Sequence, residues 1–268
     1  MKKPIQKTAV IGYPLGHSKS PFLHNAIYKK LGLKAEMIRI EHRDIKFLVQ
    51  KIKQLNIGLC AVTMPFKQSI IKYLDQVDRQ AKAVQAVNTV ISKKGKLIGY
   101  NTDIDGIKFA LRDVPIKHKT VLLVGAGGVG CAVAYYISSR GGKILYFNRT
   151  KMKSQNLQKE FGGTVIAEKD LQELKIDMVI NTTPVGMYPL VKYSPLKKTI
   201  FTPNQYVFDL VYNPVKTQLL KDAKHAGAKV ISGIEMFTGQ ALRQIELFSG
   251  LNLDSKSLFD FARKLLLA

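Results

Sequence analysis

Residues 121–130 read V-L-L-V-G-A-G-G-V-G, and this segment constrains the architecture of the chain most strongly. Four apolar residues predict a buried strand, and the apolar spacing from Cys131 to Ser139 predicts a helix after the glycines. Strand, G-x-G-x-x-G loop and helix in this order are typical of a dinucleotide site. Gly125 would permit the tight turn, Gly127 the approach of backbone to a pyrophosphate, and Gly130 close packing of helix on strand.

The next predicted strand ends in F-N-R-T at residues 147–150. An NAD site would usually place an acidic residue here for the ribose 2′-hydroxyl. Arg149, with Lys153 nearby, instead offers a planar cation and a second charge for a 2′-phosphate. The segment therefore favours NADP over NAD, the alternative being an exposed arginine at a strand end.

Apolar runs alternate with helical patterns along the chain, which predicts an α/β protein of two domains. Strands are predicted at 8–12, 35–40, 58–63, 89–92, 121–124, 143–147, 178–181 and 206–209, and helices at 21–31, 44–55, 66–74, 103–111, 235–248 and 255–267. The first domain is an N-terminal α/β domain. Short strands separated by helices after residue 120 imply parallel βαβ units, so the second is Rossmann-like with a parallel sheet.

Composition narrows the class of protein. The 268 residues are 46% hydrophobic, with no apolar run long enough for a membrane span and no apolar segment behind the basic N-terminus. We expect a cytoplasmic protein without a membrane partner. The two cysteines, Cys60 and Cys131, predict neither a disulfide framework nor a metal site.

The net charge is unusual: 42 basic and 19 acidic residues leave +23. The basic residues are spread over many segments without a dense tail, so we expect a solvated surface and no nucleic-acid partner. Such a charge also attracts anionic substrates and cofactors.

Two serines lie in a turn-forming segment, G-Y-P-L-G-H-S-K-S-P-F-L-H-N at residues 12–25. Ser18 and Ser20 are two residues apart, so in an extended segment both point the same way and can bind one small polyol or carboxylate. The alternative is structural, with Ser20 as the N-cap of a helix that has Pro21 in its first turn.

Three further segments place polar side chains where strands end or begin: A-V-T-M-P-F-K at 61–67, A-V-N-T at 86–89 and G-Y-N-T-D-I-D-G at 99–106. Thr63, Lys67, Asn88, Asn101 and Asp103 could thus converge at one rim of a sheet. An aspartate can fix the position and charge of a lysine, and a positioned lysine can protonate a carbonyl oxygen as hydride reaches the carbon. This chemistry is ketone reduction by NADPH.

These motifs, with N-T-T-P-V-G-M at 181–187, Y-N-P at 212–214 and M-F-T-G-Q at 236–240, resemble in order those of the shikimate dehydrogenase family. The resemblance covers nearly the whole chain. It implies NADP-dependent reduction of 3-dehydroshikimate to shikimate, a step of aromatic amino-acid biosynthesis.

The resemblance also implies the site residues. Substrate would be held by Ser18, Ser20, Thr63, Lys67, Asn88, Asp103, Tyr212 and Gln240, with Lys67 and Asp103 as the catalytic pair. NADP would be bound by Gly125, Ala126, Gly127, Gly128, Val129, Asn148, Arg149, Thr150, Lys153, Leu210 and Gly233. Which member of the catalytic pair moves the proton stays open.

By the same resemblance, residues 1–102 with 237–268 form the substrate domain, and residues 103–236 form an inserted NADP domain. The active site would lie in the cleft between them. We expect a monomer or a homodimer.

Two positions depart from the family pattern. Ala61 stands where the family has Asn, and Gln85 where it has Gly, which puts substrate affinity in question more than reaction type. Two alternatives remain: a quinate/shikimate dehydrogenase of broader specificity, and a ligand sensor or nucleic-acid-associated regulator on the same scaffold.

Overall fold

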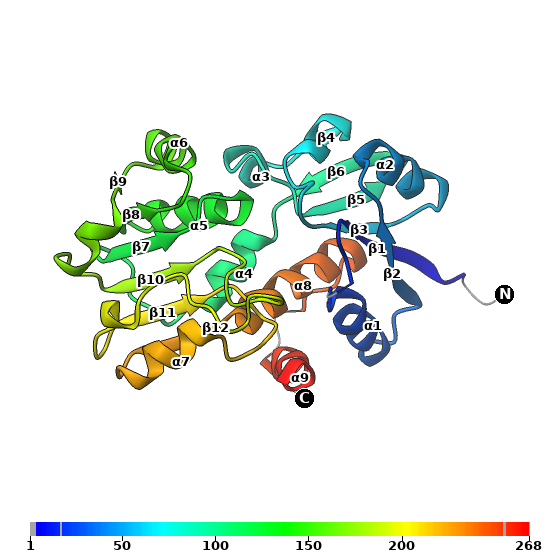
Figure 1. Cartoon of the computed structure of the whole chain (residues 1–268). Helices are drawn as coiled ribbons and strands as arrows, with labels where there is room; N and C mark the ends of the chain where they lie inside the picture. The colour runs from blue at the N-terminus through cyan, green and yellow to red at the C-terminus, as the bar shows by residue number, and fades with distance from the viewer. Residues whose placement is uncertain (1–3, 17, 254–255, 268) are drawn as a thin grey trace. The chain divides into compact units, whose positions relative to one another are not determined.

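The computed structural model describes residues 4–16, 18–253 and 256–267 (Figure 1). The chain forms two compact units, Met1–Asp105 with Thr238–Ala268 (unit 1) and Gly106–Phe237 (unit 2). It passes from one unit to the other inside helix α4 (Asp103–Ala110) and returns inside helix α8 (Gly233–Ser249). Each unit contains a sheet and helices, which confirms the predicted α/β class.

The sheet of unit 1 has six strands in the order β2-β1-β3-β5-β6-β4. They are β1 (Gln6–Gly12), β2 (Ala35–Glu41), β3 (Leu59–Val62), β4 (Gln76–Val77), β5 (Thr89–Lys93) and β6 (Lys96–Tyr100). Strands β2, β1 and β3 are parallel, whereas β5 is antiparallel to both β3 and β6. The β5–β6 hairpin, whose second strand was not predicted, turns at Lys94 and Gly95, both with positive φ, as a two-residue hairpin turn requires.

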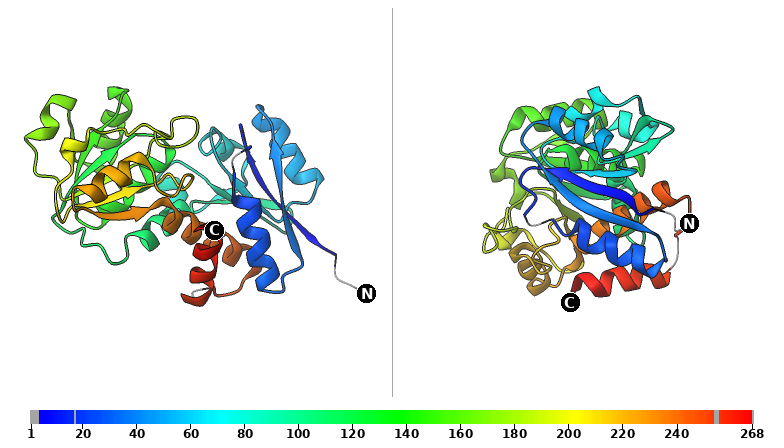
Figure 2. Two further views of the ribbon diagram at one scale, coloured as in Figure 1. Left: turned by 60° about the horizontal axis from the view of Figure 1, so that its bottom comes forward. Right: turned by 90° about the vertical axis from the view of Figure 1, so that its right-hand side faces the viewer.

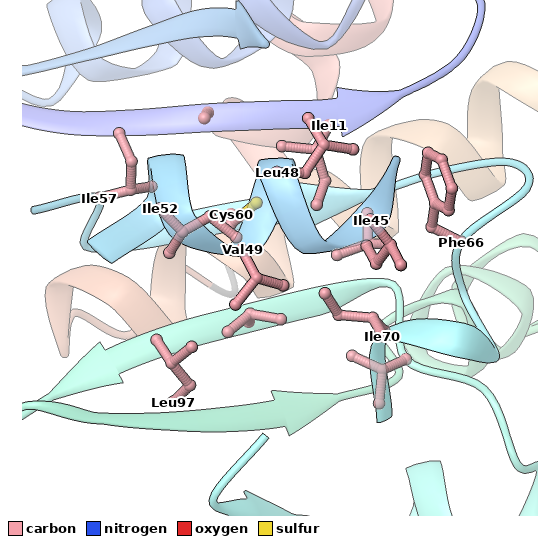
Figure 3. Close-up of a cluster of buried hydrophobic side chains, with 14 of the residues drawn as sticks. Ile11, Ile45, Leu48, Val49, Ile52, Ile57, Cys60, Phe66, Ile70 and Leu97 are labelled. Atoms are coloured by element: carbon pink, nitrogen blue, oxygen red, sulfur yellow. The ribbon is translucent and has the colours of Figure 1, made fainter. Parts of the chain in front are cut away.

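One face of this sheet is covered by helix α2 (Ile45–Gln54). Asp44 caps the helix by accepting from the Lys46 N–H. Its buried residues Ile45, Leu48, Val49 and Ile52 repeat at helical spacing and pack, with Cys60 among others, into the cluster of Figure 3. The 3₁₀ helix η1 (Ser69–Tyr73) adds Ile70 to this cluster where a longer helix, 66–74, was predicted.

The opposite face of the sheet carries helix α1 (Ser20–Lys30). Thr8 on β1 points to this side and its hydroxyl lies 3.2 Å from the hydroxyl of Tyr28. The Asn25 amide exchanges two hydrogen bonds with the backbone of Met37, which fastens α1 to β2. Helix α9 (Lys256–Leu267) lies beside α1 in both views of Figure 2.

The remaining helix of unit 1, α3 (Arg79–Ala83), lies between β4 and β5 in the sequence.

Unit 2 has an all-parallel sheet in the order β12-β11-β10-β7-β8-β9, which confirms the prediction for this half of the chain. Its strands are β7 (Thr120–Val124), β8 (Lys143–Phe147), β9 (Thr164–Val165), β10 (Met178–Asn181), β11 (Tyr206–Asp209) and β12 (Lys229–Ser232). Its helices are α5 (Gly128–Ser139), α6 (Lys151–Phe161), α7 (Gln218–His225), η2 (Glu168–Gln172) and η3 (Lys198–Ile200). Residues of α7 pack against β7, β10 and β11 in a second buried cluster.

Within the described ranges, no helix is both long and apolar enough to cross a bilayer.

Candidate active site

Four strand ends of unit 1 meet at one edge of its sheet. Parallel β1 and β3 both finish there, and because β5 is antiparallel to β3 and to β6, the start of β5 and the end of β6 lie at the same edge. The backbone confirms this proximity, since Val62 N–H donates to the Asn88 carbonyl and Asn88 N–H to the Tyr100 carbonyl. Thr63 and Lys67 follow β3, Asn88 immediately precedes β5, and Asp103 follows β6.

Lys67 and Asp103 form an ion pair at this edge. Lys67 Nζ lies 2.6 Å from Asp103 Oδ2, and the two side chains retain 19% and 7% of their exposure. Asp103 begins helix α4, and the Lys67 carbonyl accepts from Val87 N–H, which ties the lysine to the segment before β5. The pair is therefore mostly buried, while part of the lysine still reaches solvent.

The Asn88 amide is almost fully used inside the protein. Its Nδ2 donates to Asp103 Oδ1 at 2.8 Å and to Thr102 Oγ1 at 3.1 Å, and its Oδ1 accepts from the Thr102 N–H at 2.7 Å. Asn88 thus holds the carboxylate oxygen that Lys67 does not. Contact between Asn88 and a substrate needs one of these bonds to be exchanged.

Hydrogen bonds continue from Asn88 into the core of unit 1. Thr89 Oγ1 donates to Asn88 Oδ1 at 2.9 Å, and Gln244 Nε2 donates to Thr89 Oγ1 at 2.9 Å. His24 Nε2 lies 3.0 Å from Gln244 Oε1, and His24 Nδ1 lies 2.9 Å from the Ser20 carbonyl oxygen. Burial lowers the pKa of His24 to about 4, so the ring is neutral at pH 7.

The N-terminus of α1 lies one residue earlier than predicted. The N-cap is Lys19 and makes no side-chain cap bond, so the structural alternative, with Ser20 as N-cap, is wrong. Ser20 is the first helical residue, and in the described part of the chain its Oγ has no protein hydrogen-bond partner. Ser18 Oγ accepts from Ser20 N–H at 3.4 Å, and Arg39 donates to the Ser18 carbonyl. Both hydroxyls are thus held in one short segment.

Thr63 follows β3 directly and its N–H donates to the Ile11 carbonyl. A Cβ at Gly12 would lie only 2.5 Å from the Thr63 methyl carbon, so only glycine lets the turn after β1 approach this residue. Asn101, also predicted at this rim, is buried. It donates from Nδ2 to the Ala86 carbonyl, and its Oδ1 has no hydrogen-bond partner among the described residues.

Two predicted substrate residues come from further along the chain. Gln240 is a buried residue of α8 in unit 1. Tyr212 belongs to unit 2, where its ring stacks on Phe237 with the centroids 4.2 Å apart. Participation of Tyr212 in a common site with the residues of unit 1 stays a prediction.

The glycine loop of unit 2 has the geometry that its sequence suggests. Gly125 has φ +100°, and a Cβ there would lie 2.6 Å from Thr182 Oγ1. A Cβ at Gly130 would lie 2.9 Å from the Gly125 carbonyl oxygen, whereas one at Gly127 would have no atom within 4 Å. Gly127 is the N-cap of α5, so open space lies where backbone N–H groups and the helix dipole favour an anion. Ala126, Gly128 and Val129 complete this loop.

Arg149 and Lys153 lie between the end of β8 and the first turn of α6, and both are exposed. Within the described ranges, neither has an acidic group at salt-bridge distance. Asn148 Nδ2 donates to the carbonyl of Thr150, the N-cap of α6, which shapes this turn. The two cations are therefore available to a phosphate.

Leu210 and Gly233, predicted to contact the cofactor, are neighbours in unit 2. A Cβ at Gly233 would overlap the Leu210 carbonyl carbon at 2.7 Å. The segments after β11 and β12 can approach this closely only because residue 233 is glycine.

Two family models match the chain. The shikimate dehydrogenase substrate binding domain matches residues 10–90, and shikimate / quinate 5-dehydrogenase matches residues 108–213. The chain belongs to the shikimate dehydrogenase family. The family predicted from the motifs is thereby confirmed.

Members of the shikimate dehydrogenase family match over almost the full length. The shikimate dehydrogenase (NADP(+)) of Clostridium beijerinckii is 36% identical over 251 residues, which is 92% of this chain and 93% of that protein. The crystal structure of the Thermus thermophilus enzyme with NADP(H) and shikimate has a TM-score of 0.87 at 31% identity, covering 97% and 99% of the two chains. A quinate dehydrogenase from Corynebacterium glutamicum in complex with NAD has a TM-score of 0.88 at 29% identity, covering 98% of each.

Sequence reasoning missed part of the candidate site. His24, Thr89, Thr102 and Gln244 carry the buried hydrogen bonds behind Asn88, yet none was singled out. Thr89 and Thr102 stand inside the quoted motifs beside Asn88 and Asp103. Gln244 lies one helical turn after Gln240, a spacing that places both on one side of α8.

Proposed function

We propose that this protein catalyses the NADP-dependent, reversible reduction of 3-dehydroshikimate to shikimate, in the pathway to the aromatic amino acids. Family membership sets the reaction class. The single observation that supports catalysis by this chain is the mostly buried Lys67–Asp103 pair, held on both sides at the edge where four strand ends meet.

Substrate recognition is assigned to polar side chains around this edge. Ser18 and Ser20 bind the carboxylate, because hydroxyls of one segment can donate to the same anion. Thr63, Asn88 and Gln240 bind ring hydroxyls, and the family motifs make Tyr212 of unit 2 a further substrate residue. These assignments follow the family motifs. Because Asn88 and Gln240 are buried, little water competes for their hydrogen bonds to the substrate.

The catalytic step needs a proton at the carbonyl oxygen of 3-dehydroshikimate. Lys67 carries an N–H donor beside Asp103, and the carboxylate holds it in place by a charge-assisted bond. In the reduction, the C=O double bond becomes C–H and O–H, so one proton passes from the Lys67–Asp103 pair to oxygen. In the reverse direction the same pair accepts it.

The cofactor site fits the residues of unit 2. The open space at Gly127 and the N-terminus of α5 can hold a pyrophosphate, and Arg149 with Lys153 a 2′-phosphate. When bound, NADPH supplies the hydride that the ketone carbon receives. Thr150, Leu210 and Gly233 complete the proposed contacts.

The direct test is absorbance of the reduced nicotinamide, with shikimate or quinate as substrate and NADP or NAD as oxidant. We expect fast reduction of NADP when shikimate is the substrate. Comparable rates with quinate or with NAD would instead support the broader quinate/shikimate enzyme. No rate with any pair would reject the enzyme and favour the regulator.

A first prediction concerns Lys67. Lys67→Ala removes one member of the pair that transfers the proton and should lower kcat by about 10²- to 10⁴-fold, while NADP still binds to unit 2. Steady-state kinetics and a fluorescence titration of NADPH measure the two effects. Because the change leaves Asp103 buried and unpaired, thermal unfolding of the variant must show that it is folded at the assay temperature. Near-normal turnover in a folded variant would exclude Lys67 from the mechanism.

A further inference from the structure

A chain of buried hydrogen bonds runs from the proposed catalytic pair to the middle of α8. We propose that Thr89 and Gln244 are positioning residues of the reaction, which hold the Asn88 amide in the orientation that fixes Asp103 beside Lys67. The inference rests on the proposed function, because it has a meaning only if Lys67 and Asp103 transfer the proton. It extends to two residues that the family motifs did not assign.

The donors and acceptors from Gln244 to Asp103 can be followed in one direction, with the Thr102 hydroxyl as a side contact 3.0 Å from Thr89 Oγ1. Gln244 Nε2 donates to Thr89 Oγ1, and the Thr89 hydroxyl then donates to Asn88 Oδ1. Asn88 Oδ1 also accepts from the Thr102 N–H, so its oxygen faces the core. Its Nδ2 is left to donate to Asp103 Oδ1 at 2.8 Å.

Rotating the Asn88 amide by half a turn would break this arrangement. Its oxygen would then face the Asp103 carboxylate, and its nitrogen would face the Thr102 N–H, a donor against a donor. Thr89 strengthens the preference, because its hydroxyl donates to the Asn88 oxygen. The chain therefore selects the amide orientation that supports the carboxylate.

Burial makes this selection strict. Thr89 is 0% exposed, Gln244 is 1% exposed and Asn88 is 3% exposed, so water cannot replace a lost partner easily. Gln244 is itself held by the fully buried His24 at 3.0 Å. The start of α1, the edge of the sheet and α8 are thus joined at one polar network within unit 1.

The test compares Thr89→Val with Thr8→Val. Valine has nearly the shape of threonine, so both changes remove one hydroxyl from a fully buried position of the same sheet. Only Thr89 lies on the chain to Asp103, since the Thr8 hydroxyl contacts Tyr28 and the Glu36 carbonyl. Both variants are assayed as full-length protein with shikimate and NADP, and their thermal unfolding is measured.

We expect Thr89→Val to lower kcat about 10- to 100-fold, with a much smaller change in KM and in NADPH affinity. The primary deuterium isotope effect on kcat is measured in the opposite direction, the reduction of 3-dehydroshikimate by NADPH deuterated at the transferred position, and should rise because hydride transfer becomes slower. Thr89→Ser, which restores the hydroxyl, should recover most of the rate. Gln244→Leu combined with Thr89→Val should cost little more than Thr89→Val alone.

Equal kcat in Thr89→Val and Thr8→Val would overturn the inference and leave the hydroxyl a purely structural role. If Thr89→Val does not fold, Gln244→Leu takes its place in the same assays, and an unchanged kcat and isotope effect would again overturn it. The proposed function fails separately, through an inactive wild type or a fully active Lys67→Ala variant.

Discussion

At the scale of single residues, we propose that Arg149 selects NADP over NAD. Its exposed guanidinium follows β8 without an acidic partner among the described residues, which suits a bidentate contact with a 2′-phosphate. We predict that Arg149→Ala weakens NADPH binding about 10- to 100-fold, the value of one or two charge-assisted hydrogen bonds, and leaves NADH binding nearly unchanged. Fluorescence titrations with both cofactors measure the two dissociation constants.

Lys159→Ala provides a matched control for Arg149→Ala. Lys159 is an exposed cation in the last turn of α6, the helix that follows Arg149, at the end of the helix away from Arg149. It should affect neither cofactor beyond the small effect of one surface charge. An equal loss of NADPH and NADH affinity in Arg149→Ala would reject the 2′-phosphate assignment.

Asp209 gives unit 2 a pH-dependent stability. It is completely buried at the end of β11, where it accepts from the Thr217 hydroxyl, the Asn181 amide and the Val211 N–H. Burial raises the pKa of Asp209 from 3.8 to about 6 despite these bonds. Since the folded state binds this proton more tightly than the unfolded state, the contribution of Asp209 to stability falls as pH rises from about 4 to above 6.

We predict that this contribution decreases by about 2 kcal/mol between pH 4.5 and 7.5. Asp209→Asn removes the titration, so the free energy of unfolding of the wild type minus that of the variant should decrease by this amount. Denaturant titrations of both proteins across the range measure it. A difference that stays constant with pH would show that Asp209 does not titrate there.

Whether a residue of the candidate site could be predicted depended on whether a short sequence motif marks it. The glycine loop, Arg149 and Lys67 could be predicted because each stands in a short motif with a recognisable neighbour. His24 and Gln244 could not, because they are 220 positions apart and meet only when α8 packs against α1 and the sheet. Asn101 was expected beside the catalytic pair, but its amide faces the Ala86 carbonyl.

At the scale of secondary structure elements, helix α3 ends in a motif that normally requires glycine. Ala86 N–H donates to the Ala81 carbonyl and Gln85 N–H to the Lys82 carbonyl, which is the Schellman pattern. Gln85 stands at the left-handed position with φ +48°, which a Schellman motif usually gives to glycine. A left-handed side-chain residue costs about 1–2 kcal/mol, more than the entropy that glycine loses on folding.

We therefore predict that Gln85→Gly stabilises the protein by about 0.5–1 kcal/mol, or a rise in Tm of about 1–3 °C. Gln85 is exposed, so no packing is lost. Gln85→Ala keeps the Cβ and should give no such gain. Thermal unfolding of the three proteins settles the matter, and a lower Tm for Gln85→Gly would mean that the Gln85 side chain makes a compensating contact.

Helices and strands were predicted correctly where the apolar pattern was strong, and wrongly where the element is short or follows a tight turn. Helix α2 was predicted to within a residue because its buried positions repeat at helical spacing, and strand β7 because it is a continuous run of buried apolar residues. The segment after Lys67 was predicted as a helix at 66–74, but only the 3₁₀ turn η1 forms, since Ile70 is its one fully buried anchor. Strand β6 was missed because Lys94 and Gly95 are a weaker hairpin signal than Asn-Gly.

At the scale of the whole molecule, the two-unit organisation explains why the site residues are scattered in the sequence. Unit 1 is built from both ends of the chain, so Gln240 and Gln244 belong to the same unit as Ser18 and Asp103. The chain length and the two stretches of alternating strands and helices predicted two domains. The return of the C-terminal helices to the first half came from family resemblance, because periodicity alone does not say which sheet a helix covers.

The charge of +23 belongs to the molecule as a whole and leads to the last prediction. A strongly positive protein attracts anionic ligands at long range, and salt screens that attraction over about 10 Å at 0.1 M. We predict that kcat/KM for NADPH falls several-fold between about 20 and 300 mM salt, while kcat changes little because the bound complex no longer depends on encounter.

NADH is the natural control for this experiment, because it lacks the 2′-phosphate and its two negative charges. Its kcat/KM should fall less steeply with salt than that of NADPH. If kcat/KM fell equally with salt for both cofactors, or did not fall, the positive charge would not act by attracting the 2′-phosphate of the cofactor. A duplex DNA titration in the same buffers would then decide whether the charge serves a polyanion, since such binding weakens linearly in log salt with a slope set by the phosphates contacted.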